Sequence, residues 1–391
     1  MIIIHGICNG VVLVLLPTIA IVRILLRSWP KYQVRSIWTG APIITMTTNA
    51  SAERRLGFDT TTIVRSAYFI TDKFDLDIFV KARKNRFIAL LITYTIFVWV
   101  CATADRVHAY NDGGLLASRR RYCFSRVELF LYKILNVKLF VWTYGGDVRS
   151  RQVTLGLGEP NCCTDCTAIR SLCHCDDEKT AKNYQRVARV AKAIFSMGDM
   201  TEYTPNSRND LFFWPIDLDK DNIYKPSYPQ VSQSKPLRVV HAPNHRQFKG
   251  TKYLEAAIQE LITEGVSIEL ILVERMPNDK ALPIYRSADL IFDQCLIGFH
   301  GYFAIEAMAL GKPVMCFIRH PEKYLLASEQ CPIINIHRDN LKDKLRKLAT
   351  SERVLLTDIG HRSRAYVEQY YTIDAFAQRL NKCYEELGVS V

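Results

Sequence analysis

Two glycine-bearing loops in the second half of the chain carry the residue types that a phosphate site needs. The first runs from Ala242 to Thr251 and places Arg246 and Lys249 just ahead of an expected helix. The second reads Gly298-Phe-His-Gly301-Tyr-Phe-Ala-Ile-Glu306 and turns into another expected helix. Cations and the free N–H groups at a helix start both bind phosphate oxygens. These loops therefore predict a site for a phosphorylated ligand.

Glu306 lies one turn or more into the second of these helices, among apolar residues. A buried carboxylate without a partner is costly, which favours a role in binding a ligand. Such a carboxylate can accept hydrogen bonds from two ribose hydroxyls. We expect Lys249 and Arg246 to neutralise a diphosphate, Gly301 and Tyr302 to supply amides, and Glu306 to hold the ribose.

The order and spacing of these motifs closely resemble the donor domain of glycosyltransferase family 4. The resemblance covers about residues 235–370 and rests on Lys249-Gly250-Thr251, Ala288-Asp289 and Gly301-x4-Glu306-Ala-Met-Ala-x-Gly311-Lys-Pro-Val314. It implies a GT-B fold, in which two Rossmann-like α/β domains face a cleft. It also implies a nucleotide-diphosphate-sugar donor on the second domain, an acceptor on the first, retention of anomeric configuration and no cofactor for catalysis.

The resemblance assigns roles to single residues of this chain. Lys249 looks like the family's diphosphate-binding lysine, Glu306 like its ribose-binding glutamate, and Arg246 lies near its phosphate-binding arginine. The family's other glutamate would fall at position 298, where this chain has Gly298. Because that carboxylate touches the transferred sugar, the donor sugar and the stereochemistry stay open. The expected nucleotide-sugar site comprises Lys249, Gly250, His300, Gly301, Tyr302, Glu306 and Gly40.

The first half offers a looser likeness. Asp147 and Arg149 follow the strand Phe140-Val-Trp-Thr143, at a turn that lies at the mouth of the cleft in similar enzymes, and Gly40 resembles the loop after the first strand. We count Asp147 with Lys249, Arg246 and Glu306 as a candidate catalytic residue. Gly-Gly-Asp is also an ordinary strand-ending turn. Equally, His241 and His300 are either ligand contacts or structural histidines.

Five cysteines crowd into Cys162-Cys163-Thr-Asp-Cys166-x6-Cys173-His174-Cys175. Four thiolates can hold one tetrahedral zinc ion, and we expect Cys163, Cys166, Cys173 and Cys175 to do so, with Cys162 or His174 as substitutes. Disulfides and plain reduced thiols are the alternatives. The other seven cysteines are scattered singly among apolar runs, which indicates a reducing compartment.

Strand-like and helix-like segments alternate in both halves, which predicts an α/β protein with two doubly wound parallel sheets. We expect an acceptor-side domain at 31–235 (cysteine cluster 162–175), a donor domain at 236–370, and a C-terminal helix at 371–391 that packs back on the first domain. The polar stretch 224–235 is predicted to be the linker. The clearest expected strands are 35–39, 138–143, 237–241, 268–273, 289–293 and 313–317.

The first 30 residues predict a membrane anchor or an interfacial helix. Between Ile2 and Val22 there is no Asp, Glu, Lys or Arg, and His5 is the only side chain that can carry positive charge; Arg23, Arg27, Lys31 and Arg35 follow. This basic flank would keep the catalytic domains on the cytoplasmic side. A first Rossmann strand and helix, or a signal peptide, are the alternatives. The second apolar run, 87–102, indicates a helix buried in an α/β layer, with a membrane-dipping face as the lesser alternative.

Charge is uneven along the chain. Residues 1–235 hold 31 Lys and Arg against 20 Asp and Glu, whereas residues 236–391 hold 20 against 19. A basic first half indicates an anionic partner, such as a membrane surface, and the run Arg119-Arg-Arg121 is a solvated patch or a phospholipid contact. No nucleic-acid-binding motif is present, so nucleic acid is not expected as a partner.

Together these features predict a membrane-associated glycosyltransferase. It would move a sugar from a nucleotide-diphosphate donor to a lipid-linked or saccharide acceptor, as in polysaccharide or glycolipid biosynthesis. The alternatives are a nucleotide-sugar epimerase of the same fold and a catalytically inactive binding subunit, which Gly298 makes conceivable.

Overall fold

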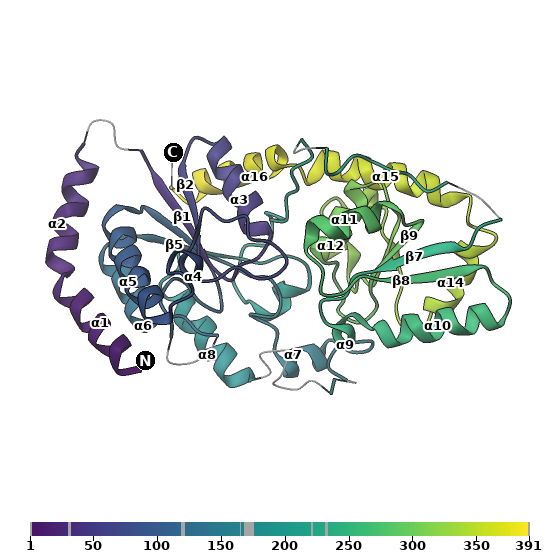
Figure 1. Ribbon diagram of the computed structural model, residues 1–391, viewed down its shortest axis with the longest axis horizontal. Coiled ribbons are helices and arrows are strands. Elements are labelled where there is room, and N and C mark those ends of the chain that lie inside the picture. The colour runs from purple at the N-terminus through teal and green to yellow at the C-terminus, as the bar shows by residue number, and fades with distance from the viewer. Residues whose placement is uncertain are drawn as a thin grey trace.

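The computed structural model describes residues 2–29, 33–118, 122–164, 166–167, 176–219, 222–230 and 234–389. It has two α/β lobes side by side (Figure 1). The first lobe contains one parallel sheet and most of the chain before residue 217, and the second lobe contains the other sheet. One cluster of buried apolar side chains continues from the first lobe into the second through Trp214, Phe299 and Tyr371.

The first sheet has the strand order β3-β2-β1-β4-β5-β6, and all its pairs are parallel. Every residue of β4 is buried, as expected for a central strand covered by helices on both faces. Its strands are β1 (Arg35–Gly40), β2 (Asp59–Val64), β3 (Leu76–Asp77), β4 (Arg106–Tyr110), β5 (Lys138–Trp142) and β6 (Ala193–Phe195). Its helices are α3 (Thr45–Arg55), α4 (Ile78–Lys81), α5 (Arg86–Thr103), α6 (Arg126–Ile134), α7 (Arg151–Gly156) and α8 (Asp177–Ala188), followed by the 3₁₀ helix η1 (Gly198–Tyr203).

The second sheet has the order β11-β10-β9-β7-β8, again all parallel. The order changes direction at β7 and β9, where open α/β sheets bind ligands. Its strands are β7 (Leu237–His241), β8 (Ile268–Leu272), β9 (Leu290–Gln294), β10 (Val314–Cys316) and β11 (Ile334–Asn335). Its helices are α9 (Arg246–Lys249), α10 (Thr251–Thr263), α11 (Asn278–Arg286), α12 (Tyr302–Ala309), α13 (Pro321–Tyr324), η2 (Ser328–Gln330), α14 (Leu341–Ala349) and α15 (Leu355–Tyr370).

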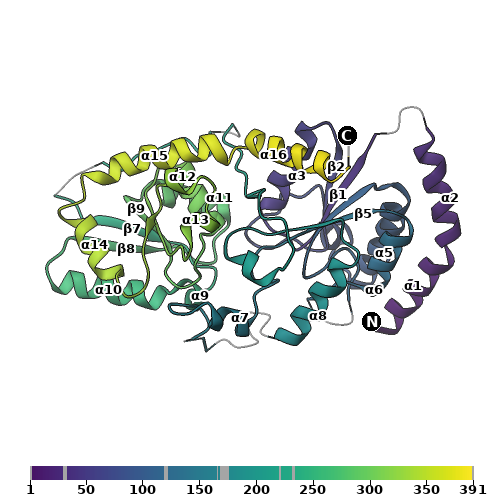
Figure 2. The same cartoon turned by 180° about the vertical axis from the view of Figure 1, so that it is seen from behind.

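The last helix, α16 (Ile373–Glu386), crosses from the second lobe back to the first, as both views show (Figures 1 and 2). It packs on α3, where the Tyr384 hydroxyl donates to Glu53 Oε1 at 2.6 Å. Arg106 donates to the Val389 carbonyl at 3.0 Å, which secures the end of the chain on the first sheet. The segment expected as a linker packs on the second lobe, because the Tyr228 ring stacks on His361 at 3.6 Å.

The N-terminal segment forms two helices, α1 (Ile2–Val14) and α2 (Leu16–Arg27), bent by 53°. Pro17 at the start of α2 lacks an N–H, which explains the break. Both helices lie at the outer edge of the first lobe beside α5. The buried Arg23 donates to the carbonyls of Cys101 at 3.2 Å and Ala104 at 2.5 Å.

The expected single membrane helix is therefore not confirmed. Among the described residues, α5 alone is long and apolar enough to cross a membrane by itself, and α1 with α2 pass the same test only as a bent pair. The run 87–102 is helical as predicted, but only 33% of its 18-residue apolar window is buried. Phe87, Ile88, Leu91 and Trp99 are exposed large apolar side chains of α5.

Candidate functional site

Lys249 and Gly301 meet around a third residue, Asp293, at the carboxyl edge of the second sheet. Lys249 Nζ lies 2.5 Å from Asp293 Oδ1, and Asp293 Oδ2 accepts the Gly301 N–H at 2.5 Å. Lys249 ends α9, Asp293 lies in β9 and Gly301 caps α12. The carboxylate therefore ties together the two loops that the sequence singled out.

The charges of Lys249 and Asp293 stabilise each other in this cluster. Burial alone would raise the pKa of Asp293, yet Lys249 and the Gly301 N–H hold it below its usual value. Asp293 is fully buried, and the Lys249 side chain is 15% exposed. Gly250, between α9 and α10, has φ 75°, and a Cβ there would lie 2.4 Å from Cys295 Sγ. Only glycine fits this turn, which sets where Lys249 can point.

The two histidines are neutral. Burial is the main cause that lowers the pKa of His300 to about 4 and that of His241 to about 3. His241 Nδ1 lies 2.9 Å from the Phe292 carbonyl and Nε2 lies 2.8 Å from Thr251 Oγ1, so both ring nitrogens are satisfied within the protein. His241 therefore serves the structure, whereas His300 lies directly before Gly301 with its ring edge against Trp214.

Glu306 lies further along α12 and is 3% exposed. Its Oε1 accepts hydrogen bonds from Asn278 Nδ2 at 2.7 Å and from the Tyr224 hydroxyl at 3.1 Å. Burial raises its pKa to about 7, although both hydrogen bonds act in the opposite direction. Glu306 forms no ion pair with a described residue, so a buried acid is held by neutral donors only.

A cavity of about 600 Å³ lies between the lobes, and both hydrogen-bond partners of Glu306 line it. Asn278, Tyr224 and Tyr302 line it from one side. Ile44, Thr47, Thr48 and residues 68–73 line it from the first lobe. The Asn278 N–H donates to the Ile70 carbonyl at 3.2 Å, which closes one end. This volume falls within the range of small-molecule sites.

Arg246 begins the same short helix that Lys249 ends, but it pairs with other carboxylates. Its guanidinium pairs with Glu274 at 3.0 Å and with Glu255, and its side chain is 44% exposed. Two carboxylates of the same lobe thus already neutralise it. The role of Arg246 at a diphosphate stays a prediction.

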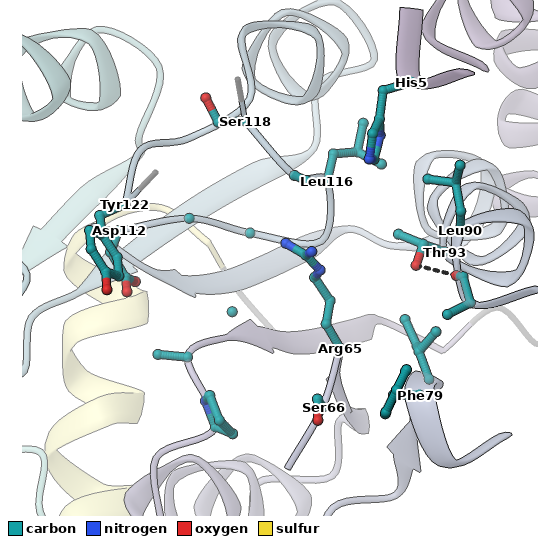
Figure 3. Close-up of a pocket in the computed structure, with 18 of the residues that line it drawn as sticks. His5, Arg65, Ser66, Phe79, Leu90, Thr93, Asp112, Leu116, Ser118 and Tyr122 are labelled. Carbon is teal, nitrogen blue, oxygen red and sulfur yellow. Dashed lines mark hydrogen bonds between the residues drawn. The ribbon is translucent and has the colours of Figure 1, made fainter. Parts of the chain in front are cut away.

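A second cavity, of about 940 Å³, opens in the first lobe beyond the carboxyl ends of β1, β2 and β4. Gly40 and Asp112 line it, and Arg65 reaches into its middle (Figure 3). Gly40 has φ 103°, and a Cβ there would lie 2.6 Å from the Gly113 carbonyl. Close approach of these two loops thus explains the glycine at position 40.

Asp112 is an acid in this cavity that sequence reasoning missed. The Tyr144 hydroxyl donates to its Oδ2 at 2.9 Å, while its buried Oδ1 has no partner among the described residues. Burial raises the pKa of Asp112 to about 6. Its only sequence signal is its place at a strand end, in Asn111-Asp112-Gly113-Gly114.

Asp147 lines neither cavity. Its Oδ1 accepts the N–H groups of Tyr144 at 2.9 Å and Gly145 at 3.0 Å, so it closes its own turn. Burial, followed by the charge of Asp112, raises the pKa of Asp147 to about 7. Arg149 is held by Asp199 at 2.7 Å. The alternative of an ordinary strand-ending turn describes this geometry.

The cysteine cluster is described only in part. Cys162 and Cys163 are buried free thiols and Cys166 is half-buried, while Cys173, His174 and Cys175 lie outside the described residues, as does Arg119-Arg-Arg121. Within the described residues, no three His, Cys, Asp or Glu side chains are placed to hold a metal ion. The zinc site stays a prediction.

No family model and no curated protein sequence matches the chain. Solved structures do match. Sucrose-phosphate synthase from Thermosynechococcus elongatus superposes with a TM-score of 0.59 at 12% identity, covering 91% of this chain and 99% of that one. Anabaena HepE in complex with UDP-glucose gives 0.57 at 10% identity, covering 91% and 100%. A glycosyltransferase from Rickettsia africae gives 0.54 at 12% identity, covering 92% and 99%.

This chain has the GT-B fold. About nine tenths of the chain is covered in these superpositions, so the likeness extends over both lobes. At 10–12% identity the likeness concerns the fold, and the site must be argued from its own residues.

Proposed function

We propose that this protein is a glycosyltransferase that takes a sugar from a nucleotide-diphosphate donor. The observation that carries this proposal is the arrangement along α12. Lys249, Asp293 and Gly301 meet at its start, and Glu306 lies further along, held by Asn278 and Tyr224, which line a cavity between the lobes. This geometry suits a ligand with a diphosphate at one end and a ribose at the other.

The cation acts on the leaving group. As the bond between sugar and phosphate breaks, negative charge grows on the diphosphate oxygens, and Lys249 supplies positive charge there. In the unliganded protein Asp293 neutralises that lysine, so Asp293 positions it rather than touching the substrate. Glu306 would accept hydrogen bonds from the ribose hydroxyls, either in place of those from Asn278 and Tyr224 or in addition to them.

The acceptor is proposed to bind the first-lobe cavity. Gly40 and its neighbours Ala41 and Pro42 line that cavity, while Ile44 and Thr47 line the cavity between the lobes. The loop after β1 and the first turn of α3 thus border both spaces in one continuous segment, which is what transfer between two substrates requires. Retention of configuration follows from the family resemblance, and the anomeric configuration of the product tests it.

We also propose that the enzyme works at a membrane surface from the cytoplasmic side. Exposed apolar side chains cover α2 and its end, among them Ile24 at 66%, Leu25 at 64% and Trp29 at 69%. Lys81, Arg83, Lys84 and Arg86 form an exposed basic turn before α5. Apolar side chains beside basic ones bind anionic lipid surfaces.

A panel of nucleotide sugars, screened by thermal stabilisation and then for hydrolysis without acceptor, tests the donor. A ligand that binds the native state raises its melting temperature. Stabilisation and slow release of the nucleotide support a transferase. Stabilisation without any turnover would indicate an inactive binding subunit, and recovery of an epimerised nucleotide sugar would indicate an epimerase.

A further inference from the structure

Two arginines of the first-lobe cavity form no ion pair with a described carboxylate. Arg65 follows β2 and Arg86 begins α5, and both line the cavity of about 940 Å³. Within the part of the chain that the structure describes, neither guanidinium has an ion pair or a hydrogen bond. Arg149, by contrast, is paired with Asp199. Arg65 acts on the buried Glu128 only through space, without an ion pair. Two like charges that face one cavity and lack a direct partner favour an anionic occupant.

The position of Arg86 strengthens this reading. A helix start carries partial positive charge, so a cation in the first turn is unfavourable unless an anion binds nearby. The side chain of Asn85 already accepts the N–H groups of Phe87 at 2.9 Å and Ile88 at 3.1 Å, so the helix does not need Arg86 for its cap. Arg65, Arg86 and the helix start thus all favour negative charge in the same cavity.

The wall of the cavity beyond the arginines is built from the apolar helices. His5 of α1 and Ala89, Leu90 and Thr93 of α5 line it. On the same two helices, Leu91 is 47% exposed and Ile7 is 62% exposed. The anion site therefore borders the exposed apolar surface of the lobe.

Figure 3 orders these features across the cavity. Leu90 and Thr93 lie on one side, the Arg65 guanidinium lies in the middle, and Asp112 lies on the other side. A molecule with its apolar chain at α5 and its anion at Arg65 would direct its far end toward Asp112.

We propose that this cavity binds the phosphate or diphosphate group of a lipid-linked acceptor, through Arg65 and Arg86, with the lipid chain along α1 and α5. The inference rests on the proposed function and names the class of its acceptor. A sugar or hydroxyl at the far end of the acceptor then meets Asp112, on the side of the cavity away from the lipid.

Isothermal titration of the full chain with three probes tests this inference. Farnesyl diphosphate carries both the chain and the anion, farnesol only the chain, and inorganic pyrophosphate only the anion. We expect farnesyl diphosphate to bind at least about tenfold more tightly than either partial probe, because burial of each CH₂ and each charge-assisted hydrogen bond contribute separately.

The matched variants are Arg65→Gln, Arg86→Gln and Arg83→Gln. Arg83 lies in the same exposed basic turn as Arg86 but does not line the cavity. We expect the first two to weaken farnesyl diphosphate binding at least about tenfold and the third to leave it unchanged. Because all three arginines are exposed, unchanged melting temperatures should accompany these effects.

Several results would overturn the inference. Pyrophosphate that binds as tightly as farnesyl diphosphate indicates a free-anion site, and farnesol that does so indicates an apolar pocket. Binding that is unaffected by Arg65→Gln and Arg86→Gln, or equally weakened by Arg83→Gln, excludes the assigned site. No binding of farnesyl diphosphate excludes the acceptor class, while donor hydrolysis dependent on Lys249 would leave the proposed function standing. Arginine-dependent binding without any nucleotide-sugar binding would contradict the proposed function instead.

Discussion

Lys249 Nζ lies 2.5 Å from Asp293 Oδ1, and the other oxygen of that carboxylate accepts the Gly301 N–H. The lysine is therefore held by a buried acid before any donor arrives. Removing the lysine has two consequences: the departing diphosphate loses a cation, and a buried carboxylate loses its partner. A single substitution mixes these effects, whereas a pair of substitutions separates them.

We predict that Lys249→Ala lowers kcat by about 10²-fold or more and also lowers stability by about 3–5 kcal/mol, because it leaves Asp293 unpaired. The double variant Lys249→Ala with Asp293→Asn should recover much of the stability and none of the turnover. Denaturant unfolding and donor hydrolysis measure the two quantities. If the double variant regains turnover, or if Lys249→Ala turns over normally, the diphosphate assignment is wrong.

Arg246→Ala is the matched cation control. Arg246 is 44% exposed and paired with Glu255 and Glu274, so its loss should change stability by less than about 1 kcal/mol. We expect its effect on kcat to be far smaller than that of Lys249→Ala. A loss of turnover as large as that of Lys249→Ala would indicate that Arg246 also binds the diphosphate.

Glu306→Gln should raise the stability of the unliganded protein while weakening donor binding. Burial raises the native pKa of Glu306 from 4.5 to about 7. Between these values the native state holds more protons than the unfolded state, so this contribution to stability falls as pH rises. Glutamine keeps an oxygen for Asn278 and Tyr224 but carries no charge.

The advantage of Glu306→Gln in melting temperature should thus be larger at pH 8 than at pH 5. Donor affinity should fall by about 1.5 to 3 kcal/mol, since charge-assisted hydrogen bonds to ribose are lost. Asp112 and Asp147 titrate in both proteins, so their effects cancel in the comparison. An equal difference in melting temperature at both pH values would contradict the pKa assignment.

Much of the fold could be predicted from local pattern. The strand Leu237–His241 begins and ends where its apolar run predicted, and the α12 helix follows Gly301 as its glycine turn predicted. Short apolar runs bounded by polar turns are strong signals in parallel sheets. The two helices α1 and α2 were expected as one helix. The bend between them comes from Pro17, and a hydropathy pattern contains no information about such a bend.

The site was harder to predict because its partners are distant in sequence. Asp293 is 44 residues from Lys249 and lies within an apolar strand, where periodicity shows a strand and nothing about its partner. Asn278, which donates a hydrogen bond to Glu306, begins α11. This helix was not predicted because Pro283 lies inside it. Arg65 and Asp112 follow different strands, and only the parallel sheet brings them to one cavity.

If α2 binds the membrane, substitution of its exposed apolar residues should weaken vesicle binding, whereas a matched pair of substitutions on the second lobe should not. We expect Ile24→Gln with Leu25→Gln to reduce co-sedimentation with anionic phospholipid vesicles several-fold. Val354→Gln with Leu355→Gln, at 60% and 48% exposure on the second lobe, should have no effect. Deleting residues 1–30 is a poorer test, because Arg23 is buried against α5. Equal binding by both variants would exclude α2 as the membrane surface.

The cysteine cluster predicts one zinc ion per chain, held by Cys163, Cys166, Cys173 and Cys175. Clustered thiolates bind this ion tightly, and a structural zinc contributes directly to folding free energy. Metal analysis of purified protein should give a stoichiometry near one, and a chelator should lower the melting temperature. Cys173→Ser with Cys175→Ser should remove the metal, whereas Cys331→Ser, a half-buried thiol of the second lobe, should not. A stoichiometry near zero, with a melting temperature that the chelator leaves unchanged, would leave only disulfides or free thiols.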